Sequence, residues 1–398
     1  MNTAEIQALD SQYVAPTYAR APFVIERGEG VYVYDTDGKR YIDCVAGIAV
    51  NALGYGDPDV RAAVADQMAR LTHISNLYTS LPQAQLAKML VERSFADKVF
   101  FCNSGAEAME AAIKFARKWA HVHGQTDKTE FVAFSHAFHG RTMGALALTP
   151  RSYYQDAFKP LMPGVSIAEY NDLGSAEALV NERTCAVVVE PLQGEGGVHP
   201  AEPVFLQGLR ALCTRANALL IFDEVQCGLA RTGTLWAHEP YGVTPDLMAL
   251  AKPLGGGLPM GAALMTQAVA DCVAPGDHAS TFGANPAICA AAKVVLSKLS
   301  APEFLGHVRE MGAFLQQNLA GLQSKHRSIR AVRGRGLIWG IEADRDVAPV
   351  IEEGYRQGLI TCKAGANVVR LVPPLVIQQA ELSEVVAILD RAFGLLED

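Results

Sequence analysis

Residues 218–226 read Ala-Leu-Leu-Ile-Phe-Asp-Glu-Val-Gln, a short, unbroken apolar run that ends in two acids, of which Asp223 is the first. Such a run is typical of a strand buried on both faces of a parallel sheet. A second apolar run, residues 247–251, ends in Lys252 and a glycine triplet. Because ligands in open α/β sheets bind outside the carboxyl ends of the strands, we expect Asp223 and Lys252 to face one crevice.

Lys252 and Asp223 together indicate a specific chemistry. A lysine in a partly apolar site loses its proton readily and, as a free amine, can form a Schiff base with a carbonyl. A nearby carboxylate can keep a pyridinium nitrogen protonated, as pyridoxal phosphate enzymes require. The alternative is a solvated lysine and an acid that caps the next element, which is the common situation for charged residues. Phosphate-binding and ring-contacting residues have to decide between the two.

The composition indicates a well-buried globular protein. Half of the 398 residues are hydrophobic and 19% are charged, and a chain of this length usually forms two domains. The net charge of −8, without a basic stretch, disfavours binding to nucleic acid. The eight cysteines are scattered, so we expect reduced thiols in a cytoplasmic protein and neither a disulfide framework nor a metal site. Residues 1–12 are polar and carry acids, so we expect no signal peptide. No apolar stretch reaches membrane-spanning length, so we expect no membrane association.

Strand-like and helix-like segments alternate between residues 60 and 290, as in a mostly parallel sheet covered by helices. The predicted strands of this region are 99–101, 131–134, 186–189, 219–222 and 247–251. We therefore expect an α/β protein with a large domain at 60–290. Beyond it the pattern changes to a long helix, strands at 337–342 and 368–371, and a final helix from Glu381. We interpret 291–398 as a smaller α/β domain, joined by an N-terminal segment and hairpin at 1–59.

Residues 100–108 read as a strand, a turn and the first turn of a helix. Ser104 and Glu107 have the spacing of a capping box, which predicts a helix that begins at Ser104. The free N–H groups and dipole of a helix N-terminus favour an anion, and Gly105 lets a phosphate approach the backbone. The alternative is an ordinary capped helix. A dinucleotide site at Gly334, Gly336 and Gly340 is disfavoured, because the spacing is one residue off and a strand follows.

Residues 134–142 follow another predicted strand and contain both an aromatic ring and a cation. Phe138 can stack on a flat ring, and Arg141 can bind a carboxylate through two hydrogen bonds. His136 and His139 are three residues apart, a spacing that can bind metal. No third ligand cluster accompanies them, so we expect no metal here.

Together these segments resemble one family closely, the class III (subgroup II) pyridoxal-phosphate aminotransferases, and within it the acetylornithine branch. The resemblance runs from about Tyr18 to the C-terminus and implies the PLP-transferase fold of type I. Its landmarks occur in family order, at Asn103–Glu107, Phe138–Thr142, Glu190–Gly197, Asp223–Gln226, Ala251–Lys252 with the glycine triplet, and Ser280–Gly283 before Asn285–Pro286. One landmark alone is weak, whereas six in order are strong.

The resemblance implies pyridoxal 5'-phosphate as the cofactor. Lys252 is then the Schiff-base lysine and proton shuttle, and Asp223 pairs with the pyridine nitrogen. The other cofactor contacts implied are Ser104, Gly105 and Ala106 at the phosphate, Phe138 stacked on the ring, Gln226 on the ring hydroxyl, and Val225. In this family Thr281 completes the phosphate site of the neighbouring subunit, which implies a homodimer.

The resemblance also implies how substrates bind. Arg370 matches the arginine that binds the α-carboxylate of glutamate, and Glu195 matches the acid that pairs with it when no carboxylate is there. Arg141 takes the distal carboxylate, and Ser280 and Tyr18 contact substrate. Gly47 stands where ornithine aminotransferases have tyrosine, and the space fits an acylated substrate, although a tight turn also explains a glycine.

These correspondences predict ping-pong transfer of the δ-amino group of N-acetylornithine to 2-oxoglutarate, giving N-acetylglutamate semialdehyde and glutamate in arginine biosynthesis. Succinylornithine, ornithine or a carrier-bound aminoadipate semialdehyde remains an alternative substrate. Rivals from other classes are a lysine-based aldolase or decarboxylase without cofactor and a non-catalytic nucleotide-binding module. Four residues depart from the family pattern, namely Ala106, Ala230, Pro253 and Ala284, and none of them removes a chemical group.

Overall fold

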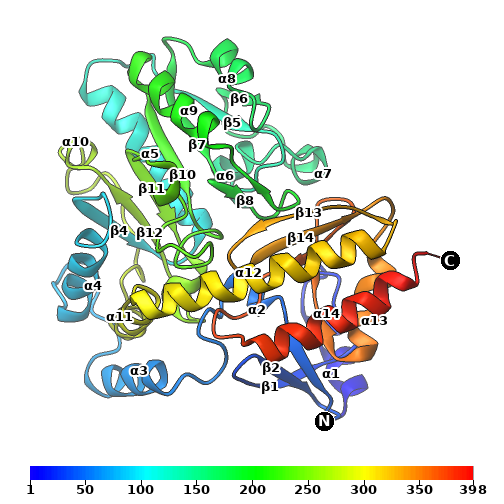
Figure 1. Ribbon diagram of the computed structural model, residues 1–398. Coiled ribbons are helices and arrows are strands. Elements are labelled where there is room, and N and C mark those ends of the chain that lie inside the picture. Colours follow the sequence, from blue (N-terminus) through cyan, green and yellow to red (C-terminus); the bar gives the residue numbers. More distant parts are fainter. Residues whose placement is uncertain (398) are drawn as a thin grey trace.

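The computed structural model describes residues 1–397, and its largest unit is a seven-stranded sheet (Figure 1). In spatial order the strands are β4 (Lys98–Cys102), β12 (Gly261–Met265), β11 (Leu247–Leu250), β10 (Leu219–Asp223), β7 (Thr184–Val189), β5 (Glu130–Phe134) and β6 (Val165–Ala168). All are parallel except β12, which runs antiparallel to both of its neighbours. The predicted α/β class and mostly parallel sheet are confirmed, and the antiparallel β12 is an addition that the sequence did not predict.

The apolar run at 219–222 is buried on both faces of the sheet, as predicted. Leu219 and Ile221 pack in the cluster that contains the buried face of α5 (Gly105–Val122). Leu220 and Phe222 pack in the other cluster, with the buried leucines of α9 (Pro203–Arg215). Side chains alternate across a strand, so helices on both sides explain why the run has no polar position.

Strand pairing brings the two chemistry-bearing strand ends together. β10 and β11 are parallel neighbours, and Asp223 lies opposite Ala249 in their register. Ala249 is three residues before Lys252, so the acid and the lysine leave the same edge of the sheet. The crevice predicted from the sequence therefore forms at this edge.

Two smaller four-stranded sheets lie beside the large one (Figure 1). One consists of β13 (Ile329–Arg335), β14 (Ile338–Ala343), β17 (Val368–Leu371) and β16 (Cys362–Ala364), with α13 (Ala348–Gln357) and α14 (Gln379–Gly394) nearby. The other consists of the hairpin strands β1 (Ile25–Glu29), β2 (Tyr32–Asp35) and β3 (Arg40–Asp43) with β15 (Leu359–Ile360). Because β3 pairs with β15 across the length of the chain, we propose that residues 1–59 and 291–398 form the small domain and 60–290 the large one. Asp398 lies outside the described residues.

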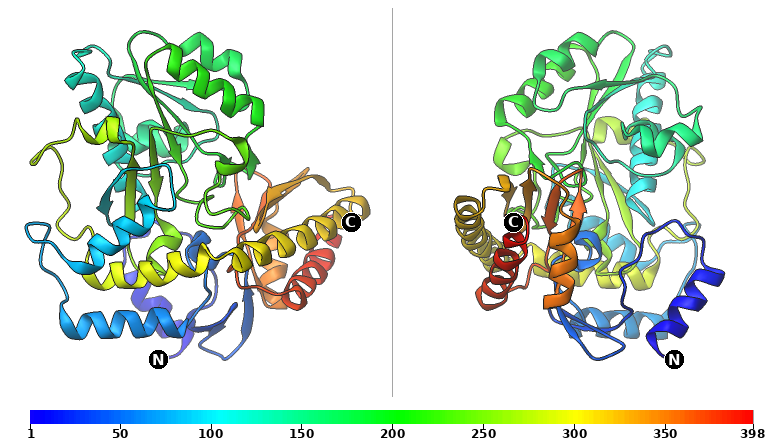
Figure 2. Two further views of the ribbon diagram at one scale, coloured as in Figure 1. Left: turned by 60° about the vertical axis from the view of Figure 1, so that its left-hand side comes forward. Right: turned by 90° about the vertical axis from the view of Figure 1, so that its right-hand side faces the viewer.

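Two helical regions differ from the sequence prediction. The long helix after Asn285 is two helices, α11 (Pro286–Leu299) and α12 (Pro302–Lys325), because Pro302 cannot continue a helix but fits the first position of a new one. The lead-in contains α1 (Thr3–Tyr13), which no apolar pattern predicts because none of its residues is buried. Figure 2 shows α1 at the outer edge of the molecule.

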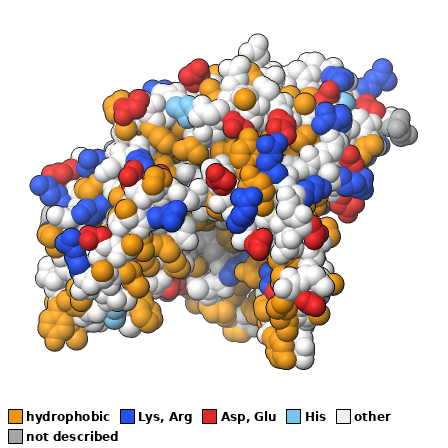
Figure 3. All heavy atoms as spheres, turned by 90° about the horizontal axis from the view of Figure 1, so that it is seen from below, with side chains coloured by type: hydrophobic (Ala, Val, Ile, Leu, Met, Phe, Trp, Pro, Cys, Tyr) orange, Lys and Arg blue, Asp and Glu red, His pale blue; other side chains and the backbone are white. Residues whose placement is uncertain are grey.

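The remaining elements connect these units. They are α2 (Ala46–Ala49), α3 (Pro58–Arg70), α4 (Leu81–Val91), α6 (Met143–Ala147), α7 (Ser152–Gln155), α8 (Leu173–Leu179), α10 (Gln267–Ala270) and the short strands β8 (Leu192–Gln193) and β9 (His199–Pro200). None of the helices in the described chain combines the length and the apolar character needed to cross a membrane. Seen from below, the molecule is hollowed between two projecting parts, and hydrophobic side chains lie on both (Figure 3).

Candidate active site

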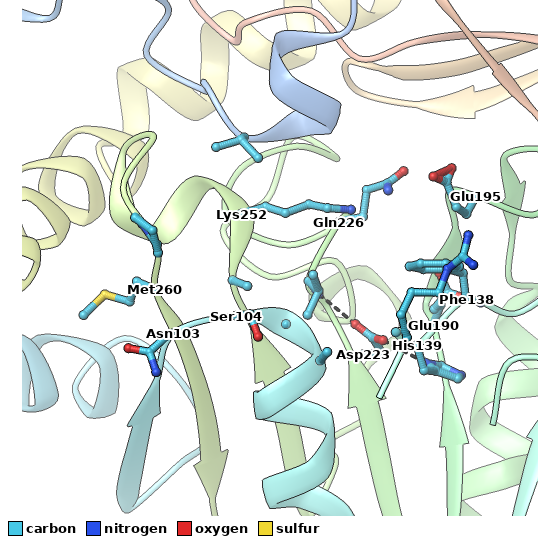
Figure 4. A pocket seen from close by; sticks show the side chains of 18 of the residues that line it. Asn103, Ser104, Phe138, His139, Glu190, Glu195, Asp223, Gln226, Lys252 and Met260 are labelled. Carbon is cyan, nitrogen blue, oxygen red and sulfur yellow. Dashed lines mark hydrogen bonds and ion pairs between the residues drawn. The ribbon is translucent and has the colours of Figure 1, made fainter. Parts of the chain in front are cut away.

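A cavity of about 450 Å³ opens where β7, β10 and β11 end and α5 begins (Figure 4). Of the residues predicted for the site, its lining includes Ser104, Gly105, Ala106, Phe138, Arg141, Glu195, Asp223, Val225, Gln226 and Lys252. These residues come from five separate stretches of sequence. The fold brings them to one place because the loops that carry them leave one end of the sheet.

Lys252 lies in the cavity with a strained backbone and a perturbed amine. Its φ is +42°, in the left-handed region that residues other than glycine rarely adopt, so the surrounding loop fixes its position. Burial lowers the pKa of the Lys252 amine to about 8, although Glu195 opposes the shift. About a tenth of the amine is therefore uncharged and nucleophilic at pH 7, far more than for a lysine with an ordinary pKa.

Asp223 is held by a buried histidine. His139 Nδ1 lies 2.7 Å from Asp223 Oδ2, and the backbone N–H of Val225 donates to Oδ1 at 3.0 Å. Burial alone would lower the pKa of His139, but the hydrogen bond and charge of Asp223 raise it overall. The hydrogen bond of the imidazole and that of the Val225 N–H hold the Asp223 carboxyl group in one orientation.

His139 is the first functional residue that the sequence reasoning missed. The sequence indicated a metal spacing with His136, whereas His139 is committed to Asp223. Across residues 1–397, no three His, Cys, Asp or Glu side chains lie close enough together to hold a metal ion. The sequence does place His139 in the loop after β5. That loop lies close to Asp223 because β5, β7 and β10 are consecutive in the sheet.

Glu190 is the second missed residue. It follows β7, lines the cavity, and its Oε2 accepts from the backbone N–H of Phe138 at 3.2 Å. Burial raises the pKa of this carboxyl to about 7, against the opposing influence of His139. An acid directly after a buried strand was the same signal that identified Asp223.

The N-terminus of α5 forms an anion cradle. The helix begins at Gly105 with Ser104 as its cap, as predicted, and Ser104 Oγ accepts from the N–H of Glu107 at 3.2 Å. Only half of the predicted capping box forms, because Glu107 accepts from the N–H of Asn103 at 2.7 Å instead. A Cβ at Gly105 would lie 2.8 Å from a methyl group of Val225, so glycine allows this close packing. The first N–H groups of the helix have no partner within it and are available to a phosphate.

Arg370 and Glu195 form an ion pair through Nη1 of the arginine. Arg370 lies in β17 and is 1% exposed, whereas Glu195 lies on the loop after β8 and lines the cavity. Burial alone would raise the pKa of Glu195, but the charges of Arg370 and Lys252 bring it below its ordinary value. The structure thus brings together the two residues predicted to exchange partners.

Arg141 lies at the mouth of the cavity. Its guanidinium carbon is 3.4 Å from the centre of the Tyr154 ring, and that of Arg151 is 5.5 Å from the same centre. Neither arginine forms a salt bridge within residues 1–397. An arginine without a salt bridge in the lining, Arg141, with a second close to the same tyrosine, favours an anionic substrate.

Four predicted residues do not line this cavity, and Arg370, which binds the lining residue Glu195, is one of them. Ser280 Oγ accepts from Nδ2 of Asn103, another lining residue, at 3.1 Å. Thr281 is exposed. Tyr18 is 76% exposed and borders a separate hollow formed by residues 6–25. A single chain therefore does not bring Tyr18 or Thr281 to the lysine.

Three of the residues that depart from the family pattern lie in turns, and the turn backbone forms in spite of the substitution. Ala230 and Ala284 have φ of 71° and 61°, in the left-handed region that favours glycine. Each alanine costs about 1–2 kcal/mol there. Pro253 is buried in the short 3₁₀ turn Lys252–Gly255, where a proline can be accommodated near the start.

The cavity fits pyridoxal phosphate by the chemistry of its donors. The α5 N-terminus suits the phosphate, the Phe138 ring suits a flat heterocycle, and Asp223 suits a protonated ring nitrogen. The Lys252 amine, with its lowered pKa, suits a carbonyl. When bound, pyridoxal phosphate supplies an electron sink for bonds at the carbon that carries the amine.

The chain is similar to known aminotransferases. The family model of class-III aminotransferases matches residues 13–393. The chain is 50% identical to the mitochondrial acetylornithine aminotransferase of Alnus glutinosa, over 99% of this chain and 88% of that one. It is 47% identical to the succinylornithine transaminase of Yersinia enterocolitica, over 94% and 92%. The crystal structure of the ornithine aminotransferase of Toxoplasma gondii superposes with a TM-score of 0.96 at 33% identity, over 100% and 96%.

The family model covers nearly the whole chain, and the relatives are similar along almost their full length. The fold is accordingly the PLP-transferase fold of type I. The chain belongs to the class-III aminotransferase family and is a transaminase that depends on pyridoxal phosphate.

Proposed function

We propose that this enzyme transfers the δ-amino group of N-acetylornithine to 2-oxoglutarate, giving N-acetylglutamate semialdehyde and glutamate, as in arginine biosynthesis. The observation that carries the proposal is the ion pair of Arg370 with Glu195 beside Lys252. In this ion pair a buried arginine can bind a carboxylate of the substrate, and Glu195 of the protein neutralises it when no such carboxylate is bound. The relative in Alnus glutinosa, named for acetylornithine, supports the same substrate.

Lys252 and Asp223 perform the central steps in this proposal. The uncharged Lys252 amine would hold the cofactor at its carbonyl, and the same amine would move the proton at the reacting carbon. The Asp223 carboxylate, held by His139, keeps the ring nitrogen protonated. The Phe138 ring packs on the face of the heterocycle, and Ser104, Gly105 and Ala106 hold the phosphate, with Gln226 and Val225 completing the contacts.

Arg370 and Glu195 allow one cavity to accept two different substrates. N-acetylornithine presents its δ-amine without a carboxylate at that end, so Glu195 stays on Arg370 and neutralises it. 2-Oxoglutarate presents its α-carboxylate, which replaces Glu195 on Arg370. Arg141, at the mouth, binds the distal carboxylate, and Ser280 and Tyr18 provide further substrate contacts.

We propose a homodimer in which Thr281 completes the phosphate site of the neighbouring subunit. Leu77, Tyr78 and Leu81 are exposed hydrophobic side chains that follow Asn76 in the sequence, and Phe282 is another that follows Thr281. Asn76 Nδ2 connects the two segments by donating to the carbonyl oxygens of Ser280 and Gly283. Burial of exposed hydrophobic side chains favours association. We also propose a cytoplasmic location, since all eight cysteines are free thiols.

The alternative is the same reaction on a different substrate, namely succinylornithine, ornithine or a carrier-bound aminoadipate semialdehyde. The similarity to a succinylornithine transaminase favours the first of these. Gly47, which the sequence related to substrate size, has φ of 65°. The backbone conformation alone therefore favours glycine at this position. Gly47 is for that reason weaker evidence for an acylated substrate.

The proposal is tested by amino transfer to 2-oxoglutarate from acetylornithine, succinylornithine, ornithine and γ-aminobutyrate in parallel. We expect the highest kcat/KM with acetylornithine. A higher value with succinylornithine would replace the substrate but keep the chemistry. Equal, poor values with all four donors would overturn the proposed substrate class.

A further inference from the structure

Gln226 touches both the ion pair and the cavity. Arg370 Nη1, which binds Glu195, also donates to Gln226 Oε1 at 3.1 Å. A guanidinium has only donors, so the oxygen of the carboxamide must face Arg370. The Nε2 group, with two N–H donors, is then directed away from Arg370. In Figure 4 the side chain of Lys252 extends toward Gln226.

The surroundings fix both partners in this arrangement. Gln226 is 6% exposed and packs against Gly194, where any Cβ would overlap its Oε1. The other edge of the Arg370 guanidinium, Nε and Nη2, contacts Cys362 Sγ at 3.4 Å from each nitrogen. Nη1 is therefore the group of Arg370 that Glu195 and Gln226 share.

We propose that Gln226 is a positioning residue that couples the Arg370–Glu195 ion pair to the protonation of the bound cofactor. The charge of Arg370 polarises the carboxamide through Oε1 and makes the Nε2 hydrogens stronger donors to a cofactor oxygen. Stronger donors and nearby positive charge disfavour the protonated form of the cofactor. By linkage, a change of partner on Arg370 alters cofactor protonation, and the reverse holds equally. The inference rests on the proposed roles of Arg370 and Gln226.

The test is a pH titration of the visible absorbance of the cofactor-loaded enzyme. Four proteins are compared, namely the unchanged enzyme, Gln226→Met, Arg370→Met and the double variant. Each single change should move the midpoint to higher pH. If the coupling runs through Gln226, the shift of the midpoint caused by Arg370→Met should be smaller in the Gln226→Met protein than in the unchanged enzyme. We expect the two shifts to differ by roughly half a pH unit or more. Additive shifts would overturn the coupling.

Two further variants keep the test decisive. Arg141→Met removes a cavity cation that does not touch Gln226, so its shift should be the same in both backgrounds. Glu195→Gln leaves Arg370 in place but unneutralised, so it should lower the midpoint, and less so when Gln226 is methionine. This second cycle replaces the first if Arg370→Met does not fold, and equal shifts in both backgrounds would again overturn the coupling.

Steady-state kinetics separates this inference from the proposed function. Arg370→Met should raise the KM for glutamate and 2-oxoglutarate by at least about tenfold, the scale of a lost charge-assisted contact. An unchanged KM would overturn the proposed role of Arg370 itself. A raised KM together with additive shifts of the titration midpoint would overturn only the coupling through Gln226.

Discussion

His139 Nδ1 lies 2.7 Å from Asp223 Oδ2, and both residues are buried. The N–H of His139 also donates to Thr149 Oγ1 at 2.9 Å, and Thr149 in turn donates to the carbonyl oxygen of Ala145. These bonds hold the backbone at His139, and the contact with Asp223 orients its imidazole. Asp223 therefore lines the cavity with its carboxyl group already oriented.

His139→Gln should weaken this orientation without removing the acid. We expect kcat to fall by about tenfold to a hundredfold, as for loss of a charge-assisted hydrogen bond. The decrease should stay well below that of Asp223→Asn, for which we expect several orders of magnitude because the carboxylate charge is lost. Stopped-flow measurement of the donor half-reaction checks both. Equal losses would mean that His139 itself contacts the reacting groups.

The pKa of about 8 for the Lys252 amine predicts how the apoenzyme takes up its cofactor. Only the uncharged amine attacks a carbonyl, so the rate of uptake should rise with pH and level off above a midpoint near 8. Absorbance of freshly added pyridoxal phosphate follows the reaction. Lys252→Ala, the matched control, should bind cofactor without this midpoint and should not turn over. A midpoint near 10.5 would mean a solvated lysine.

Glu190 should make the stability of the enzyme depend on pH. Burial raises its pKa in the folded state to about 7, from 4.5 in the unfolded chain. The folded state therefore binds more protons between these values, and the stabilisation of the protonated form is lost as pH rises through about 7. Glu190→Gln imitates the protonated form, so its thermal midpoint should exceed that of the unchanged enzyme at pH 8 but not at pH 5. The same difference at both pH values would contradict the raised pKa.

The elements that the sequence predicts well are those defined by local patterns. The strands at 219–223 and 247–250 are unbroken apolar runs, and the start of α5 at Ser104 is set by its cap. Contacts that depend on the order of strands in the sheet could not be predicted from local sequence patterns. His139 meets Asp223 because β5, β7 and β10 are consecutive in the sheet, and no spacing along the chain encodes that order. Thr281 and Tyr18 are exposed on this chain and lie outside the cavity, so their predicted roles at the site stay predictions.

Thr281 gives a direct test of a shared site. In a mixed dimer of Lys252→Ala and Thr281→Val chains, one site combines both defects and the other combines neither. If Thr281 serves the neighbouring subunit, mixing two weak homodimers should restore up to half of the normal activity per Lys252 chain. Thr281→Val alone should weaken cofactor binding by about tenfold, the scale of one lost hydrogen bond to a phosphate. No gain on mixing, with dimer exchange verified by mass, would assign Thr281 to its own subunit.

Glu195 separates the two half-reactions. Removal of its carboxylate in Glu195→Ala leaves the buried Arg370 without its anion whenever acetylornithine binds, and an unpaired buried charge is costly. Glutamate and 2-oxoglutarate supply a carboxylate of their own, so they meet an arginine that no longer has to exchange its partner. We expect the acetylornithine half-reaction to slow by about one to two orders of magnitude and the glutamate half-reaction to be kept or improved. Single-turnover absorbance of the cofactor, with each substrate in turn, measures the two rates separately. Equal losses in both half-reactions would assign Glu195 a general structural role and would remove the basis for dual-substrate recognition at Arg370.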